Sequence, residues 1–348
     1  FAVALNGTDQ LDLFVMGGGI SNKPEKWLKY IETRAEVVVA EMKNEAGMIG
    51  AAGSLERGTT VSDFDPMERR AQHSLNSAVM HLRHHDTLVH LIDTPGYPDF
   101  VGQSMTALEA VETAAVVISA TTGIEMMSTR MMDWAARRQL CRMVIVNKID
   151  AQGVDLAALV AQVQAAFGKE CLPLNLPAAG GTKVVDCFFN TSGASDILAV
   201  DAAHRALVEQ VVEVDPDFVD RYLNDGDVDP RELHAPLEQA LREGHLIPIC
   251  FVSARNGAGV AELLDVIERL LPNPSEGNPP QFYRGEGADA VELHATPDAD
   301  LHVIAHVFKV TVDPFVGRMG IFRIHQGTVT KDSQLYIGDG RKPFKVGH

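Results

Sequence analysis

The chain has 348 residues, of which 46% are hydrophobic and 22% are charged, and its formal net charge is −17 at pH 7. This length fits two or three domains of an ordinary globular protein. The acidic excess argues against non-specific nucleic-acid binding over the whole surface, although it leaves local basic contacts with RNA open. No apolar run approaches the ~18 residues that span a bilayer, so we expect a cytoplasmic protein without membrane partners or a signal peptide.

Cysteine and histidine spacing indicates neither a disulfide framework nor a metal site. No C-x-x-C spacing occurs, and we expect free, buried thiols in a reducing compartment at Cys141, Cys171, Cys187 and Cys250. The chain has 13 histidines. Four of them cluster around a turn-like stretch: His81, His84, His85 and His90. Their spacing does not predict a metal site.

The first 170 residues are predicted to alternate strands and helices, with a polar loop and a hairpin over residues 53–92. The predicted strands are Leu13–Met16, Glu36–Ala40, Leu88–Ile92, Ala115–Ser119 and Met143–Val146. The predicted helices are Pro24–Ile31, Asn44–Ile49, Met105–Val111, Thr129–Gln139 and Leu156–Phe167. This alternation predicts an α/β fold with a parallel, doubly wound sheet.

The second half of the chain is predicted to complete this sheet and then to change to β structure. Residues 171–245 include two helices that we expect to be exposed, over 203–214 and 230–243. We interpret them as an insertion, because the sheet resumes at Ile247–Val252. The predicted domains are therefore an α/β sheet domain over 53–272 and an incomplete antiparallel β-barrel over 301–348, joined by a linker over 273–300. We expect both ends, Phe1 and His348, to be truncations.

Asp93 to Gly96 form the first chemical motif, at the end of an apolar run. The carboxylate of Asp93 suits a position beside Mg²⁺, and Gly96 lets a backbone N–H approach a γ-phosphate oxygen without a Cβ in the way. Further upstream, Thr60 offers a hydroxyl that could complete the Mg²⁺ shell. Taken alone, the Asp93 stretch is equally typical of a structural turn, and the Thr60 stretch is more typical of a polar loop.

Asn147 to Asp150 form the second motif, again after an apolar run. Asp150 can accept hydrogen bonds from N1 and the 2-amino group of guanine, a pairing that adenine does not match. Lys148 can lay its stem across the base, Asn147 can tie loops together, and Ser253–Ala254 can offer a backbone N–H to guanine O6. Because ligands gather at the carboxyl ends of strands, these motifs together predict a guanine-nucleotide site at one sheet edge.

The phosphate-binding loop expected ahead of these motifs is missing from the sequence. No G-x-x-x-x-G-K-[ST] pattern occurs in the 348 residues. Gly17–Gly19 lies between a predicted strand and a predicted helix, so its amides could face an anion, but its spacing differs and Pro24 removes one donor. The sequence therefore predicts a P-loop-NTPase-like sheet that lacks its phosphate loop.

Residues from about 53 to 348 resemble the translational GTPases, specifically elongation factor G and its paralogues. Glu56–Pro66 resembles the first switch region, Asp93–Phe100 the second, and Asp313–Arg318 the start of the barrel domain. The resemblance implies a monomeric GTPase that uses GTP with Mg²⁺ on the ribosome, its RNA and its proteins, with Thr60 and Asp93 at the metal. It also implies contacts to GTP or GDP from Asp93, Thr94, Pro95, Gly96, Tyr97, Asn147, Lys148, Asp150, Ser253 and Ala254.

Tyr97 stands where most members of that family carry a histidine that orients the attacking water, which makes Tyr97 the candidate catalytic residue. A phenol is a poor general base near neutral pH, although positioning of the water can suffice. The residues of Gly58–Asp63 and Tyr97 together favour the elongation-factor-G-like paralogues. The ribosomal role of these paralogues is less settled than the translocation activity of elongation factor G.

Residues 1–52 instead resemble the C-terminal tail of polyphosphate glucokinases and other ROK-family sugar kinases, through Leu11–Ile20, Lys26–Leu28 and Asn44–Ala52. We therefore expect a splice of two incomplete genes, joined near Ala46–Gly53. Three functions stay open: a ribosome-coupled GTPase impaired by the missing phosphate loop, a polyphosphate- or ATP-dependent glucokinase fragment, and a non-catalytic guanine-nucleotide- or ribosome-binding remnant. The sequence thus leaves open whether the chain is an enzyme.

Overall fold

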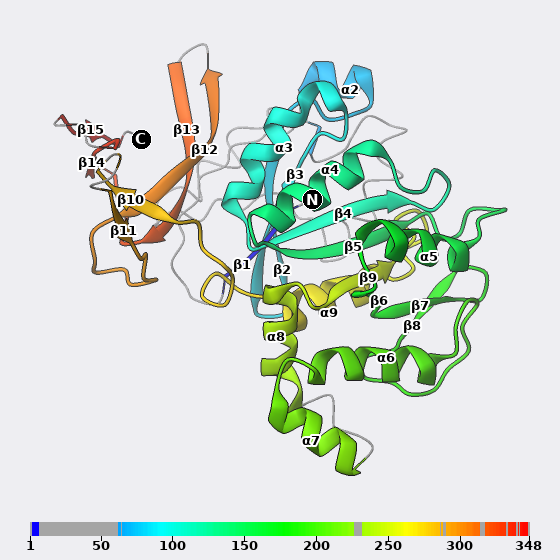
Figure 1. Ribbon diagram of the computed structural model, residues 1–348. Coiled ribbons are helices and arrows are strands. Elements are labelled where there is room, and N and C mark those ends of the chain that lie inside the picture. The colour runs from blue at the N-terminus through cyan, green and yellow to red at the C-terminus, as the bar shows by residue number, and fades with distance from the viewer. Residues whose placement is uncertain are drawn as a thin grey trace. The chain divides into compact units, whose positions relative to one another are not determined.

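The computed structural model in Figure 1 describes residues 2–6, 62–63, 65–225, 232–285, 287, 290–313, 317–331, 333–338, 340 and 342–346. The chain divides into two units, Phe1–Gly277 and Asn278–His348. The elements predicted between residues 13 and 49, together with the candidate metal ligand Thr60, lie outside the described residues.

A seven-stranded sheet forms the centre of the first unit, in the order β2-β3-β1-β4-β5-β9-β6. Its strands are β1 (Ala2–Asn6), β2 (Ala78–His84), β3 (Thr87–Asp93), β4 (Thr113–Ser119), β5 (Cys141–Asn147), β6 (Cys171–Pro173) and β9 (Ile247–Phe251). β4, β5, β9 and β6 are parallel. Because β1 is antiparallel to both β3 and β4, these two strands point the same way. The carboxyl ends of β3, β4, β5 and β9 therefore lie at one edge of the sheet.

Helices pack against both faces of this sheet (Figure 1). Along β5, Met143 and Ile145 join a core with α6, α8 and α9, whereas Val144 and Val146 join a second core with α4 and α5. Successive strand residues point to opposite faces, and here both faces are covered by helices, so residues 143–146 are all apolar. The described residues of this unit form the helices α2 (Pro66–Ala71), η3 (Pro98–Phe100), α3 (Val101–Ala107), η4 (Leu108–Ala110), α4 (Met126–Arg137), α5 (Leu156–Phe167), α6 (Val200–Val212), α7 (Pro216–Asp225), α8 (His234–Glu243) and α9 (Val260–Leu270).

The elements predicted between residues 78 and 167 are largely confirmed. The hairpin is β2–β3, and the strands predicted at Ala115–Ser119 and Met143–Val146 lie within β4 and β5. Helix α5 has the predicted bounds. Asp155 caps its first turn by accepting from the Ala158 backbone N–H at 2.9 Å, and Gly168 ends it at a φ of 117°.

Two helices in the same stretch differ from their predicted bounds. α3 begins at Val101 rather than Met105, because the 3₁₀ turn η3 runs directly into it. α4 covers Met126–Arg137 rather than Thr129–Gln139, because the chain takes a left-handed φ of 56° at Gln139. The strand β1 is not predicted at all, although its sequence Ala-Val-Ala-Leu-Asn is short and mostly apolar.

Within residues 171–245 the prediction of exposed helices is wrong. α6 buries an apolar stripe that includes Leu207, Val208 and Val211, and α8 buries Leu237 and Leu241. Their spacing of three or four residues gives each helix one core-facing side, which the acidic residues on the other side obscure in the sequence. The same segment contributes the edge strand β6 to the sheet and a hairpin of β7 (Asn175–Ala178) and β8 (Lys183–Asp186).

The second unit contains antiparallel strand pairs in its described residues. They are β10 (Phe282–Arg284) with β11 (Val291–Leu293), β12 (Ile304–Asp313) with β13 (Gly317–Gln326), and β14 (Gln334–Leu335) with β15 (Phe344–Lys345). Antiparallel β structure is therefore confirmed here, whereas closure into a barrel stays a prediction. Among the residues that the structure describes, no helix combines the length and the apolar character that crossing a membrane requires.

All four cysteines are free and buried, as predicted. Burial raises the pKa of Cys141, Cys171 and Cys250 to about 12 and also raises that of Cys187. Each thiol therefore stays protonated far above neutral pH.

We expect these thiols to be inert in the folded protein, because the thiolate is the reactive form. Treatment with a thiol-exchange reagent such as dithionitrobenzoate at neutral pH should release little chromophore from the native chain. After unfolding in guanidinium, all four thiols should react. Rapid release of chromophore from the folded protein would contradict the burial described above.

Candidate functional site

The two base-reading loops are Asn147–Asp150 and Ser253–Ala254, the segments predicted to bind guanine. They meet at the carboxyl edge of the sheet, where side-chain hydrogen bonds join them. Asn147 ends β5, and its Oδ1 accepts from the Lys148 backbone N–H at 2.7 Å and from the Ala254 backbone N–H at 3.1 Å. Ala120 N–H donates to the Asn147 carbonyl at 2.8 Å, so β4 also anchors this corner. Asn147 thus performs the predicted tying of loops.

Asp150 is oriented by the second loop of the pair. The hydroxyl of Ser253, which is fully buried, donates to Asp150 Oδ1 at 2.6 Å. A carboxylate has about four acceptor positions, so this bond fixes the group without exhausting it. Lys148 is exposed at a left-handed φ of 65°, which leaves its stem at the surface of the same loop.

The backbone N–H groups predicted to meet guanine O6 are engaged within the protein. Ser253 N–H donates to the Ala258 carbonyl at 2.8 Å, and Ala254 N–H donates to Asn147 Oδ1. A base that used the Ala254 N–H would therefore compete with Asn147 for it. In this arrangement the Ser253–Ala254 segment acts on Asp150 and Asn147 rather than facing an open position.

Gly181 packs against the backbone of the base-reading loop, a contact that no pattern in the sequence analysis indicates. A Cβ on Gly181 would lie 2.2 Å from the Ile149 carbonyl oxygen and 2.9 Å from the Asp150 nitrogen. Asp196 Oδ2 accepts from the N–H groups of Gly180 and Gly181 at 2.9 and 3.3 Å. The backbone of 180–181 is thus held against the loop that carries Asp150.

Asp93 ends β3 at the same sheet edge and lies half-buried. Burial raises the pKa of its carboxyl group, while a hydrogen bond with the Ser62 side chain acts in the opposite direction. Asp63 is buried nearby and accepts from Ser74 Oγ at 2.8 Å. The structure therefore brings the end of the predicted first switch region, Ser62 and Asp63, to the predicted metal ligand.

The chemistry at Asp93 fits a hard cation. Carboxylate and hydroxyl oxygens are the ligands that Mg²⁺ takes. A cation would also offset the cost of burying the charged form of Asp93. Thr60, the other predicted ligand, lies outside the described residues, so its relation to Asp93 is not part of this geometry.

The turn after Asp93 is fixed on one side and open on the other. Ser104 Oγ donates to the Pro95 carbonyl at 2.8 Å, which anchors the Thr94–Gly96 turn to α3. Among the described residues, no heavy atom lies within 4 Å of a Cβ built on Gly96. These residues therefore leave room beside Gly96, and its contact with a γ-phosphate stays a prediction.

Tyr97 lies at the surface of this turn, with 52% of the residue exposed. Its ring packs against His73, with centroids 4.4 Å apart and planes inclined at 40°. His73 Nδ1 lies 3.3 Å from the Ser74 carbonyl. No pattern in the sequence indicates this imidazole, which precedes Tyr97 by a whole strand hairpin.

These loops are matched by a known family and by solved and curated relatives. Residues 37–273 match the model of the elongation factor Tu GTP-binding domain. The chain belongs to this family. It is 32% identical over 315 residues to the elongation factor G-like protein of Mycobacterium tuberculosis, a match that covers 87% of this chain and 44% of that protein. It is 26% identical over 304 residues to elongation factor G of Thermotoga maritima, covering 82% and 44%.

A protein of Thermus thermophilus with a crystal structure has a TM-score of 0.67 to this chain at 27% identity, covering 87% of this chain and 48% of that one. The chain thus spans less than half the length of the relatives it matches. The resemblance to elongation factor G and its paralogues is confirmed, and the first unit contains the GTP-binding domain of a translational GTPase. The family match begins at residue 37, inside the segment 1–52 predicted to be glucokinase-like, and that assignment stays a prediction.

The packing under the base-reading loop predicts different outcomes for two adjacent glycines. Both have a left-handed φ, 66° at Gly180 and 74° at Gly181, so alanine costs about 1–2 kcal/mol of backbone strain at either position. Only Gly181→Ala also drives a Cβ into the Ile149–Asp150 backbone. We expect Gly181→Ala to lose clearly more stability in urea unfolding than its matched control Gly180→Ala, and to weaken guanosine binding. Equal losses would show that the loop does not rest on Gly181.

Proposed function

We propose that this chain is a guanine-nucleotide-binding module of a translational GTPase, one that recognises the base well and the phosphates weakly. The observation that carries the proposal is the pair of cross-loop hydrogen bonds, Ser253 to Asp150 and Ala254 to Asn147. They hold the base-reading loops in place through contacts within the protein. The base half of the site therefore needs no contact with a triphosphate to keep its shape.

Base selectivity rests on Asp150. A carboxylate offers two oxygens, which suit the neighbouring N1–H and 2-amino donors of guanine and leave adenine without a matching donor pair. Lys148, at the surface of the same loop, is positioned to cover the base plane. The family match over residues 37–273 supports the same reading of these loops.

We propose that the chain binds the phosphates of the nucleotide weakly, for two reasons. The sequence contains no G-x-x-x-x-G-K-[ST] loop. In addition, β1, which fills the sheet position between β3 and β4, runs antiparallel to both. The chain therefore enters β1 at the nucleotide edge and leaves it at the opposite edge, whereas a phosphate loop must follow a strand that ends at the nucleotide.

Mg²⁺ is proposed to accompany the nucleotide, as is typical of the GTP-binding domain family. Asp93 would contribute a carboxylate oxygen, directly or through a water, with Ser62 beside it. The ion would supply charge neutralisation for the phosphates. Thr60 is carried over as a second ligand from the resemblance alone.

The ribosome is the proposed partner, and coupling of GTP hydrolysis to the ribosome is the proposed activity of the complete protein. The support is similarity to an elongation factor G-like protein and to elongation factor G. We assign Tyr97 a positioning role rather than proton transfer. Its phenol is half exposed and packs against His73, so it can place a water or a partner surface without acting as a base.

Exchange of Asp150 tests the base site. Asp150→Asn keeps one acceptor but presents an amide donor, which suits the C2 carbonyl of xanthine and not the 2-amino group of guanine. Loss of a charge-assisted pair should cost about 3 kcal/mol or more, roughly a hundredfold in guanosine affinity. Calorimetry with guanosine, xanthosine and adenosine measures the change. Equal affinity of the unaltered chain for guanosine and adenosine would defeat the proposal.

A comparison of guanosine, GDP and GTP tests the phosphate site separately. Each hydrogen bond to a charged group is worth about 1.5–3 kcal/mol, so two or three missing phosphate contacts cost about 3–9 kcal/mol, on the order of a hundredfold to a millionfold in affinity. We therefore expect calorimetry with and without Mg²⁺ to give affinities for the three ligands within about tenfold of one another. Tight, Mg²⁺-dependent GTP binding would mean that other residues of the chain have rebuilt a phosphate site.

A further inference from the structure

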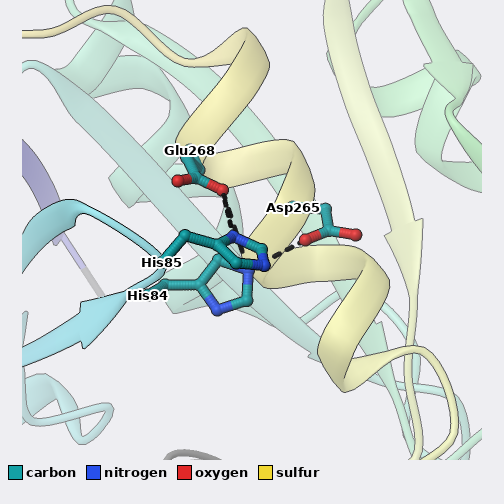
Figure 2. Close-up of side chains that lie close together, drawn as sticks. All are labelled: His84, His85, Asp265 and Glu268. Atoms are coloured by element: carbon teal, nitrogen blue, oxygen red, sulfur yellow. Dashed lines mark hydrogen bonds and ion pairs between the residues drawn. The ribbon is translucent and has the colours of Figure 1, made fainter.

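A cluster of two histidines and two carboxylates lies on the first unit, at the end of β3 opposite to Asp93. His84 ends β2, His85 begins the β2–β3 turn, and Asp265 and Glu268 come from α9 (Figure 2). One ligand atom from each of the four residues lies within 4.8 Å of every other. The nucleotide site uses none of these groups.

The distances within the cluster are those of a shell that one ion could join. His84 Nε2 lies 2.8 Å from Asp265 Oδ1 and 3.9 Å from Glu268 Oε2, and His85 Nδ1 lies 2.7 Å from Glu268 Oε2. In a tetrahedral site with bonds of about 2.0–2.1 Å, neighbouring ligand atoms are about 3.3–3.4 Å apart. These three separations lie on both sides of this value, and every other pair of ligand atoms lies within 4.8 Å, so small side-chain shifts would complete the shell.

We propose that these four residues form a zinc site that fastens the β2–β3 turn to α9. Imidazole nitrogens combined with carboxylate oxygens in fourfold coordination suit Zn²⁺. Mg²⁺ and Ca²⁺ instead take oxygen ligands at six or more positions, which this cluster does not offer. The proposal is independent of the proposed nucleotide function.

A neighbouring hydrogen bond orients one ligand of the cluster, and partial burial shields two of its ligands. Thr87 Oγ1 donates to Glu268 Oε1 at 3.2 Å, which leaves Oε2 directed at the two imidazoles. Such outer hydrogen bonds orient carboxylate ligands in metal sites. The side chains of His84 and Glu268 are each only 15% exposed, whereas those of Asp265 and His85 are 42% and 59% exposed, so half of the shell is shielded from water.

The backbone at His85 supports the same inference. His85 occupies the first position of the two-residue turn between β2 and β3 at a left-handed φ of 48°. Glycine would adopt this conformation at lower cost. A histidine at this position is more readily explained if its side chain is used, and here it reaches Glu268.

Zinc at this site would connect two elements that also serve the nucleotide loops. β3 runs from the turn to Asp93, and α9 follows the loop of Ser253 and Ala254. The ion would therefore cross-link the β2–β3 turn and α9 at the end of β3 opposite to Asp93, and it would raise the stability of the first unit. It would not contact the nucleotide.

Metal titration of the whole chain tests the site. We expect one Zn²⁺ per chain in calorimetry, with an accompanying rise in the thermal unfolding midpoint. Glu268→Gln and, separately, His84→Ala should weaken zinc binding by more than the 10–100-fold typical of an altered outer hydrogen bond. Glu262→Gln removes one charge from the exposed first turn of the same helix and should leave zinc affinity unchanged.

Replacement of zinc by Co²⁺ gives a spectroscopic readout of the ligands. Four-coordinate nitrogen and oxygen ligation should produce intense visible d–d bands without a thiolate charge-transfer band. Glu268→Gln should remove these bands while the far-ultraviolet circular dichroism stays that of the folded chain. A thiolate band, zinc affinity unchanged in Glu268→Gln, or equal losses in Glu268→Gln and Glu262→Gln would overturn the assignment.

Discussion

The nucleotide site depends on one constraint, the common direction of β3, β4, β5 and β9. Because these strands end at the same edge, Asp93, Asn147 and Ser253 come together although they are far apart in sequence. The side chains of β5 enter both cores, so this strand lies between two layers of helices, and its position sets where the loop of Asn147 begins.

The sequence predicts this core well, since its signals are local. Runs such as Met143–Val146 are wholly apolar and end in polar loops, and α5 carries its own cap at Asp155 and its own stop at Gly168. Local signals alone do not reveal that α6 and α8, which each have an acidic face, bury their other face. Their buried stripes are evident only when every third or fourth residue is compared with the core it contacts.

The contacts that could not be predicted from the sequence join segments that lie far apart along the chain. Gly181 supports the backbone of Ile149 and Asp150 through a close approach, and a glycine pair in a polar stretch is more commonly just a turn. His73 meets Tyr97, and the histidines at 84 and 85 meet carboxylates on α9, from which they are separated by more than 180 residues. Spacing rules for metal ligands work within a motif, so ligands divided between a turn and a remote helix carry no signature.

The two halves of the site therefore rest on different supports. The base half is held by bonds that are internal to the protein, Asn147 to Lys148 and Ala254, and Ser253 to Asp150. The phosphate half centres on Asp93, whose burial disfavours its charged form and leaves it to be compensated by a cation or a partner group. The hydrogen bonds that hold Asn147 and Asp150 do not involve Asp93, so the two parts of the site can be altered separately by mutation.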